Sequence, residues 1–300
     1  MIEICFLLIM SRKHIFFGEK MSKKSILLLL VCFAAFSCMA QIKVKNGDSL
    51  AFAGDKVITE GKTLRTFRGY IQLVTDTLKT SGIKIKRIDC NAASAEKLLT
   101  LLPKKVIAKK PLYLIVGIGF QEALGKNASL ENYKNNVKKI FDLAKKNSIN
   151  VIVMTSFVFS DNPGHANNAK LFPYNDFLRA EAKSNHFILA DINKALTAEL
   201  NSPALANLTT GKVTHYNTGL NGRGHFIVAA TLLEALGISK EKVAETKKAW
   251  EKKYPVNTLY LNINFSDFLN QAEKASRDKM DIKQYTIKEI KEIKEKGKAK

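Results

Sequence analysis

The fold is decided by residues 49–61, which read SLAFAGDKVITEG. The first five residues are small or apolar, as expected for a buried strand, and Gly54 and Asp55 are typical of the turn that follows a strand. Open α/β sheets bind their ligands outside the carboxyl ends of the strands. The turn at Gly54 and Asp55 is therefore the first candidate position for a functional site.

From this stretch onward, short apolar segments alternate with amphipathic segments of helical period. Such alternation is typical of an α/β domain with a parallel sheet. The sequence predicts a three-layer α/β/α fold with a sheet of about five strands and a C-terminal helical extension. The expected strands are 49–53, 83–88, 112–118, 150–155 and 187–191. The expected helices are 66–81, 95–102, 130–146, 173–184 and 224–236, the second of which is expected to end at Pro103.

Residues 21–41 read MSKKSILLLLVCFAAFSCMAQ, in which two lysines, an apolar run and small residues follow one another. This order is typical of a secretory signal peptide, so we expect export to the periplasm or the medium. Two ends of the signal compete: cleavage after Ala40, which the pattern favours, and lipidation at Cys38, which would make a lipoprotein. The expected segments are an upstream extension at 1–20, a signal peptide at 21–40, the α/β domain at 42–238 and a Lys/Glu-rich extension at 239–300.

The chain carries a formal net charge of +21, with 48 Lys and Arg against 27 Asp and Glu. Its lysines are spread along the sequence and no zinc-finger, RNA-recognition or helix-turn-helix pattern is present, so we expect no nucleic-acid partner. Anionic polymers are the expected partners of the basic faces, and membrane attachment is expected only through a lipid on Cys38. Beyond the leader Cys90 is the only cysteine, and the sequence gives no signal for a metal or an organic cofactor.

The 49–61 stretch resembles the first block of SGNH (GDSL-type) hydrolases, an apolar strand followed by Gly-Asp-Ser-Ile-Thr-Glu-Gly. Gly54, Asp55, Thr59, Glu60 and Gly61 match that block, whereas Lys56 and Val57 occupy the place of the nucleophilic serine, with one extra residue in the turn. The resemblance covers about residues 47–237 and is to the carbohydrate-esterase-like branch. It implies hydrolysis of acyl or acetyl esters by a serine, an Asp-x-x-His pair and an oxyanion hole made with glycine and asparagine.

The other blocks that resemble the family also lack reactive residues. The second block keeps Asn91 but has Ala93 at the position of the oxyanion glycine, and the third has Gly119 at the position of the oxyanion asparagine. In the last block, Tyr216 stands where the family has its aspartate and Gly219 where it has its catalytic histidine. The resemblance therefore implies a retained fold with degenerate catalytic motifs, whose altered positions should converge on one crevice.

Three functions remain open on these grounds. The first is an exported pseudoenzyme, catalytically impaired or inactive, that binds a carbohydrate or an acylated glycan. The second is an active esterase with a rearranged set such as Ser49 or Ser94 with His215, although Ser49 precedes the strand and is expected to point away from the crevice. The third is a basic, envelope-associated structural protein. The expected ligand-binding residues are Asp55, Lys56, Asn91 and Asn221.

Three other side chains have expected structural roles. His225 is expected to pack and to cap a helix, and Asp191 to cap the helix that follows its strand. The aromatic residues of the extension are expected to dock part of it onto the main domain. These residues are Trp250, Tyr254, Tyr260 and Phe265.

Overall fold

A computed structural model describes residues 43–61, 68–125, 129–208, 211–215 and 219–254. The expected signal peptide with Cys38, the altered position Tyr216, and Tyr260 and Phe265 lie outside the described residues.

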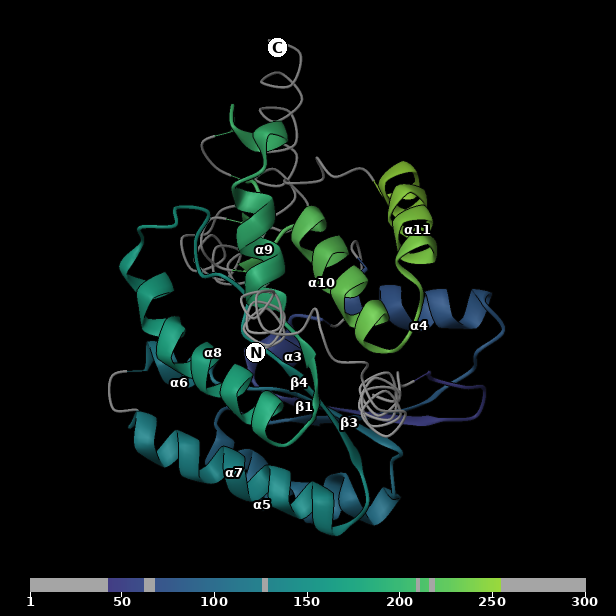
Figure 1. The fold of residues 1–300 in the computed structure, drawn as a ribbon, viewed down its shortest axis with the longest axis vertical. Coiled ribbons are helices and arrows are strands. Elements are labelled where there is room, and N and C mark those ends of the chain that lie inside the picture. The colour runs from purple at the N-terminus through teal and green to yellow at the C-terminus, as the bar shows by residue number, and fades with distance from the viewer. Residues whose placement is uncertain (1–42, 62–67, 126–128, 209–210, 216–218, 255–300) are drawn as a thin grey trace, which may run out of the picture. The chain divides into compact units, whose positions relative to one another are not determined.

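The centre of the domain is a five-stranded parallel sheet in the order β2-β1-β3-β4-β5 (Figure 1). At its carboxyl edge, Gly54 pairs with Asn91 on one side and with Gly117 on the other. The fold predicted from the sequence is thereby confirmed. The strands are β1 Ser49–Gly54, β2 Lys86–Asn91, β3 Tyr113–Gly117, β4 Asn150–Met154 and β5 Ile188–Ala190.

Helices cover both faces of the sheet, so the central strands are buried on both sides (Figure 1). One layer contains α4 Tyr70–Thr80, α9 Ile192–Leu200 and α10 Gly222–Ala235, and the other contains α5 Ala95–Lys105, α7 Leu130–Lys146 and α8 Ala166–Ser184. This cover explains why β1 and β3 read as continuous apolar runs, since Leu50–Ala53 and Leu114–Val116 are fully buried. Short helices follow β1 and β3, namely α3 Lys56–Thr59 and α6 Phe120–Leu124. A small hairpin pairs β6 Thr214–His215 with β7 Gly219–Leu220.

The prediction that Pro103 ends its helix is wrong, because α5 continues to Lys105. A proline removes one N–H and crowds the preceding turn. Here it lies in the last turn, and the burial of Leu98 and Leu102 on one face of the helix outweighs that local cost. Pro173 likewise lies inside α8 and does not begin it, and the second strand is displaced toward Asn91.

The first part of the C-terminal extension forms α11, Lys240–Lys253, which packs on α10. Trp250 is 7% exposed, and its ring centroid lies 5.9 Å from that of Phe226. Val243, on the preceding turns of the same helix, is 3% exposed. The predicted docking of Trp250 is therefore confirmed. None of the helices in the described ranges has the length and apolar character needed to cross a bilayer.

Replacing Trp250 with alanine should lower the free energy of unfolding by about 3 kcal/mol, because it removes a large buried ring and leaves a cavity. Chemical denaturation followed by circular dichroism measures the change. Lys252→Ala, on the exposed side of the same helix, is the control and should change stability by less than about 0.5 kcal/mol. Equal stability of the two variants would mean that α11 is not part of the cooperative unit.

Candidate functional site

The carboxyl edge between β1 and β3 is the switch point of the sheet. The chain leaves β1 for β2 on one side and later returns to β3 on the other. Ligands of doubly wound sheets bind at this point. The two strands approach closely there, since a Cβ on Gly54 would lie 1.7 Å from the carbonyl oxygen of Gly117. Any site here is built from the loops that carry α3 and α6.

Asp55 joins these two loops. Its Oδ1 accepts a hydrogen bond from the Val57 N–H (2.9 Å), and its Oδ2 accepts from the Gly119 N–H (3.1 Å) and the Gln121 N–H (2.9 Å). The side chain is almost fully buried, and this burial raises its pKa to about 6, although the backbone donors act in the opposite direction. Asp55 was expected to bind a ligand, but its two oxygens are occupied within the chain.

Lys56 stands on α3 at the place of the family's nucleophile and is half-buried. Its Nζ lies 5.9 Å from the centroid of the Phe120 ring, on the neighbouring loop. Burial raises the pKa of the Glu60 carboxyl, and the positive charge of Lys56 opposes this rise. Lys56 thus provides a cation between an aromatic ring and a carboxylate, where the family has a hydroxyl.

Glu60 occupies the space beside Gly219. A Cβ built on Gly219 would lie 2.1 Å from Glu60 Oε1, well inside van der Waals contact. The same oxygen accepts a hydrogen bond from the Leu220 N–H (3.0 Å), which holds the carboxylate in place. A histidine at position 219 would therefore have to displace Glu60.

Tyr133 occupies the space beside Gly119 in a similar way. A Cβ on Gly119 would lie 2.9 Å from the Tyr133 hydroxyl oxygen, which donates a hydrogen bond to the Ile118 carbonyl (3.1 Å). The backbone of Gly119 has φ +112°, a conformation that side chains rarely adopt. An asparagine at this position would be strained and would clash with Tyr133.

The loop after β2 completes the edge. The Ala92 N–H donates to the Gly54 carbonyl (2.8 Å), which places Ala93 beside the end of β1. The Ala95 N–H donates to Glu122 Oε2 (3.1 Å), and burial raises the pKa of Glu122 to about 7.

Asn91 is exposed at the end of β2. Four positions that were expected to share a crevice lie at one edge of the sheet, and the crevice itself stays a prediction. These positions are Lys56, Ala93, Gly119 and Gly219.

The rearranged set of Ser49 with His215 is not assembled. Ser49 begins β1, where its Oγ accepts from the Leu112 N–H (3.0 Å). His215 pairs with Gly219 in the small hairpin, and Gly219 lies next to Glu60. Because Glu60 comes after the carboxyl end of β1, His215 lies beyond the end of β1 that is opposite Ser49. A six-residue strand spans about 16 Å, so Ser49 and His215 cannot share a proton. Ser94 lies on the correct edge, where its Oγ accepts from the Lys97 N–H (3.2 Å) as the cap of α5.

Asp161 and Asn221 fix the backbone of residues 211–224 by hydrogen bonds. Asp161 accepts from the backbone N–H groups of Lys212 (2.6 Å) and Thr214 (2.9 Å), an interaction that the sequence did not indicate. Asn221 Oδ1 accepts from the Gly224 N–H (2.9 Å), which caps α10. Asn221 was expected to bind a ligand, yet it is 2% exposed and has a structural role.

His225 is confirmed as a packing and capping residue. It is 3% exposed, and its Nδ1 accepts from the Tyr70 N–H (3.3 Å) at the start of α4. The two rings are stacked with their centroids 6.1 Å apart. Burial lowers the pKa of His225 to about 3, so the imidazole is neutral at physiological pH.

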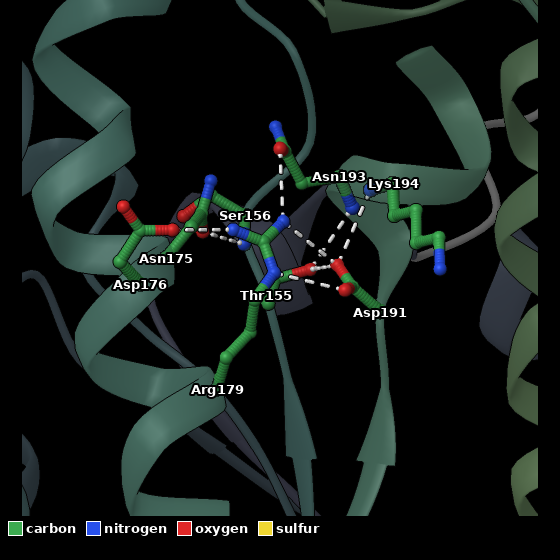
Figure 2. Close-up of polar contacts among 8 residues, drawn as sticks. All are labelled: Thr155, Ser156, Asn175, Asp176, Arg179, Asp191, Asn193 and Lys194. Atoms are coloured by element: carbon green, nitrogen blue, oxygen red, sulfur yellow. Dashed lines mark hydrogen bonds and ion pairs between the residues drawn. The ribbon is translucent and has the colours of Figure 1, made fainter. Parts of the chain in front are cut away.

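A second polar cluster lies at the carboxyl ends of β4 and β5 (Figure 2). Asp191 caps α9 by accepting from the Lys194 N–H, as predicted, and it also receives two hydrogen bonds from Arg179 (2.9 and 3.0 Å). The Thr155 hydroxyl donates to the same carboxylate (3.0 Å). Although burial alone would raise the pKa of Asp191, the hydrogen bonds from Arg179 and the other donors keep it below its usual value. This cluster ties the two strand ends together.

The described residues contain no group of three or more His, Cys, Asp or Glu side chains placed to hold a metal ion. Cys90 is a buried free thiol whose pKa is raised by burial. Sequence reasoning missed the space-filling roles of Glu60 and Tyr133. Glu60 belongs to the first block and Tyr133 to the apolar face of α7, but neither pattern indicates which glycine the side chain meets.

Comparison with known proteins agrees with the fold. No protein-family model matches the sequence, and no curated protein matches it significantly. An acetylxylan esterase from Geobacillus stearothermophilus is similar in structure, with a TM-score of 0.57 and 19% identity over 66% of this chain and 98% of that one. A variant of that enzyme, described as an acetyl-xylooligosaccharide esterase, gives a TM-score of 0.57 and 20% identity over 66% and 98% of the two chains.

An α/β hydrolase from the metagenome of Lake Arreo is also similar, with a TM-score of 0.53 and 19% identity over 64% of this chain and 96% of that one. At this level of identity the likeness concerns the fold. The chain has a hydrolase fold of the kind found in these enzymes.

A double-mutant cycle tests the contact between Glu60 and Gly219. Gly219→Ala should lower the free energy of unfolding by about 2 kcal/mol, because the new methyl group overlaps the Glu60 carboxylate. In a Glu60→Ala background the same change should cost less than about 0.5 kcal/mol. Gly164→Ala is the matched control, since a Cβ there meets nothing closer than 3.5 Å. A cost that is the same in both backgrounds would show that Glu60 does not fill this space.

Asp55→Asn should destabilise the protein by about 3 kcal/mol at pH 7, because an amide nitrogen cannot accept from the backbone donors. The folded-state pKa of Asp55, about 6, is higher than the value of 3.8 for an unperturbed group. Protonation of the aspartate therefore adds stability, beyond the cost given for pH 7, that is fully present below about pH 4 and is lost as the pH rises through about 6. The difference between the wild type and Asp55→Asn should accordingly be larger at pH 4 than at pH 8. Urea denaturation at several pH values measures it, and a difference that shrinks toward low pH would contradict the raised pKa.

Proposed function

We propose that this chain is an exported hydrolase-fold protein that does not hydrolyse esters and binds a carbohydrate or an acylated glycan at the carboxyl edge of its sheet. One observation carries the proposal. A Cβ at Gly219 would meet the Glu60 carboxylate, and a Cβ at Gly119 would meet the Tyr133 hydroxyl, so a histidine or an asparagine at these positions would require its neighbour to move.

The replacements are sufficient to abolish catalysis. Removing one oxyanion-hole donor costs roughly a hundredfold to a thousandfold in rate. Loss of the nucleophile costs about a millionfold, and the effects of residues that act as one unit are not additive. With Lys56 in place of the serine and Gly219 in place of the histidine, no proton relay to a hydroxyl nucleophile exists at the family's positions.

A sugar suits the groups that remain at this edge. Lys56 offers a cationic donor next to the Phe120 ring, and Asn91 offers an exposed amide that both donates and accepts. Sugar hydroxyls and acyl carbonyls are complementary to such groups, which orient a ligand without reacting with it. The name of the similar acetyl-xylooligosaccharide esterase supports acetylated xylo-oligosaccharides as the first ligands to test.

Export is proposed from the leader at 21–40, which has the charge and apolar pattern of a signal peptide. The processed chain then begins at Gln41, or at a lipid-bearing Cys38. Mass spectrometry of the N-terminal peptide from the expressing cell distinguishes the two ends. Recovery of the unprocessed leader would contradict export.

The binding proposal is tested by calorimetric titration of acetylated xylo-oligosaccharides into the processed protein. Lys56→Met and Asn91→Ala should each weaken binding by roughly tenfold, because each removes a protein side chain that hydrogen-bonds to the ligand. Lys86→Met, at the opposite end of β2 from Asn91, is the control and should leave the affinity unchanged. Affinity that is insensitive to Lys56 and Asn91 would place the ligand elsewhere.

The loss of catalysis is tested separately with 4-nitrophenyl acetate. The wild-type protein should release nitrophenol no faster than a solution of the unfolded chain. Turnover that disappears in Ser94→Ala would instead establish an active esterase with a relocated nucleophile. This assay can fail while glycan binding succeeds, so the two parts of the proposal are judged independently.

A further inference from the structure

The amino-end edge of the sheet, opposite the candidate site, carries a basic surface. Helices α5 and α7 both run from the carboxyl edge to the amino edge and end there in lysines. Further lysines lie in the loops that enter β2 and β3. The exposed members of this basic edge include Lys84, Lys104, Lys105, Lys109, Lys110 and Lys146.

Hydrogen bonds between the entering loops place these lysines side by side. The Gly47 N–H donates to the Lys84 carbonyl (2.8 Å), which joins the loops before β1 and β2. The Leu112 N–H donates to the Ser49 carbonyl (3.0 Å), and the Asn150 N–H to the Leu112 carbonyl (3.1 Å). The loops that enter β1, β2, β3 and β4 are therefore joined to one another at this edge.

An apolar hollow lies within this edge. A cavity of about 550 Å³ opens between the short helical turn at Ile107–Lys109 and the turn that precedes β4. Ile107, Pro111, Leu112 and Ile149 contribute apolar lining, and Lys110 contributes a charge. Leu112 is 40% exposed and lies at the mouth of this hollow.

Buried and half-buried carboxylates gather at the other edge of the sheet. Asp55, Glu60 and Glu122 surround the end of β1, and Asp191 follows β5. At the amino edge, Asp142 forms an ion pair with Lys145 (2.9 Å). The exposed lysines of the amino edge would orient that edge toward a negatively charged surface.

We propose that the basic edge binds the surface of a bilayer that contains anionic lipids. Lysines around the hollow would attract the headgroups, and the exposed Leu112 and the apolar cavity would accept acyl-chain carbons. A soluble polyanion would use the charges but not the hollow. The surface goes beyond the glycan site proposed above, and it adds a membrane contact that the sequence alone predicted only through Cys38.

The entry of the chain into the domain fits this orientation. The Val44 N–H donates to the Leu236 carbonyl (3.2 Å), at the amino-edge end of α10. Lys43 follows Cys38 by five residues, which span at most about 18 Å when fully extended. A lipid on Cys38 would thus keep the basic edge close to the bilayer and leave the glycan site facing away from it.

Vesicle sedimentation tests the proposal with the exported protein made from a precursor that carries Cys38→Ser. No lipid can then be attached at that position. Binding to vesicles of equal parts phosphatidylglycerol and phosphatidylcholine should exceed binding to phosphatidylcholine alone by roughly tenfold and should weaken as salt is added. The triple variant Lys104→Gln, Lys105→Gln, Lys109→Gln should lose most of this binding. Leu112→Gln should reduce the part of the binding that survives high salt.

The matched control is Lys97→Gln, Lys170→Gln, Lys194→Gln, which removes the same charge from exposed positions in the first turns of helices at the carboxyl edge. It should bind vesicles as the parent does. Equal loss in both triple variants would overturn the proposal, because net charge alone would then explain binding. Tighter binding to dextran sulfate than to the vesicles would also overturn it in favour of a soluble polyanion. Glycan titration of the amino-edge variant should be unchanged, which separates this test from that of the glycan site.

Discussion

The site depends on one buried carboxylate, that of Asp55. Asp55 follows β1 directly. Its carboxylate accepts hydrogen bonds from backbone N–H groups of its own loop and of the loop after β3. A single side chain therefore fixes the positions of α3 and α6 relative to each other, and with them the positions of Lys56 and Phe120. Burial makes this arrangement sensitive to the charge of the group, since it raises the pKa of Asp55 toward the physiological range. One carboxylate thus holds together the two loops at the switch point of the sheet.

Around this framework, two glycines lie in close contact with larger side chains. Gly219 leaves room for Glu60, and Gly119 leaves room for the Tyr133 hydroxyl. Close packing favours such replacements, because a cavity left by a lost side chain costs free energy. Glu60 and Tyr133 also make hydrogen bonds there, to the Leu220 N–H and the Ile118 carbonyl. A larger side chain at either glycine would therefore have to displace a hydrogen-bonded neighbour.

The strands, the long helices and the altered edge could be predicted from the sequence, because apolar period and turn residues act locally. The docking of Trp250 and the capping by Asp191 followed from the same kind of pattern. The pairing of Glu60 with Gly219 could not be predicted, since 159 positions separate the two residues and no periodicity connects them. The structural roles of Asp55 and Asn221 were missed for a related reason. The sequence does not show whether a polar residue beside a motif is exposed to a ligand or buried, and both of these are buried.

The parallel topology also explains how one domain can serve two surfaces. All strands point the same way, so every helix that returns against them ends at the amino edge, where lysines offset the negative end of the helix dipole. The loops after the strands collect at the other edge, where capping of short helices and turns favours carboxylates and amides. Charge separation across the sheet therefore arises from the same rules that build the fold. The two proposed contacts, of the amino edge with an anionic surface and of the carboxyl edge with a sugar, would each use the side chains that this topology collects at that edge.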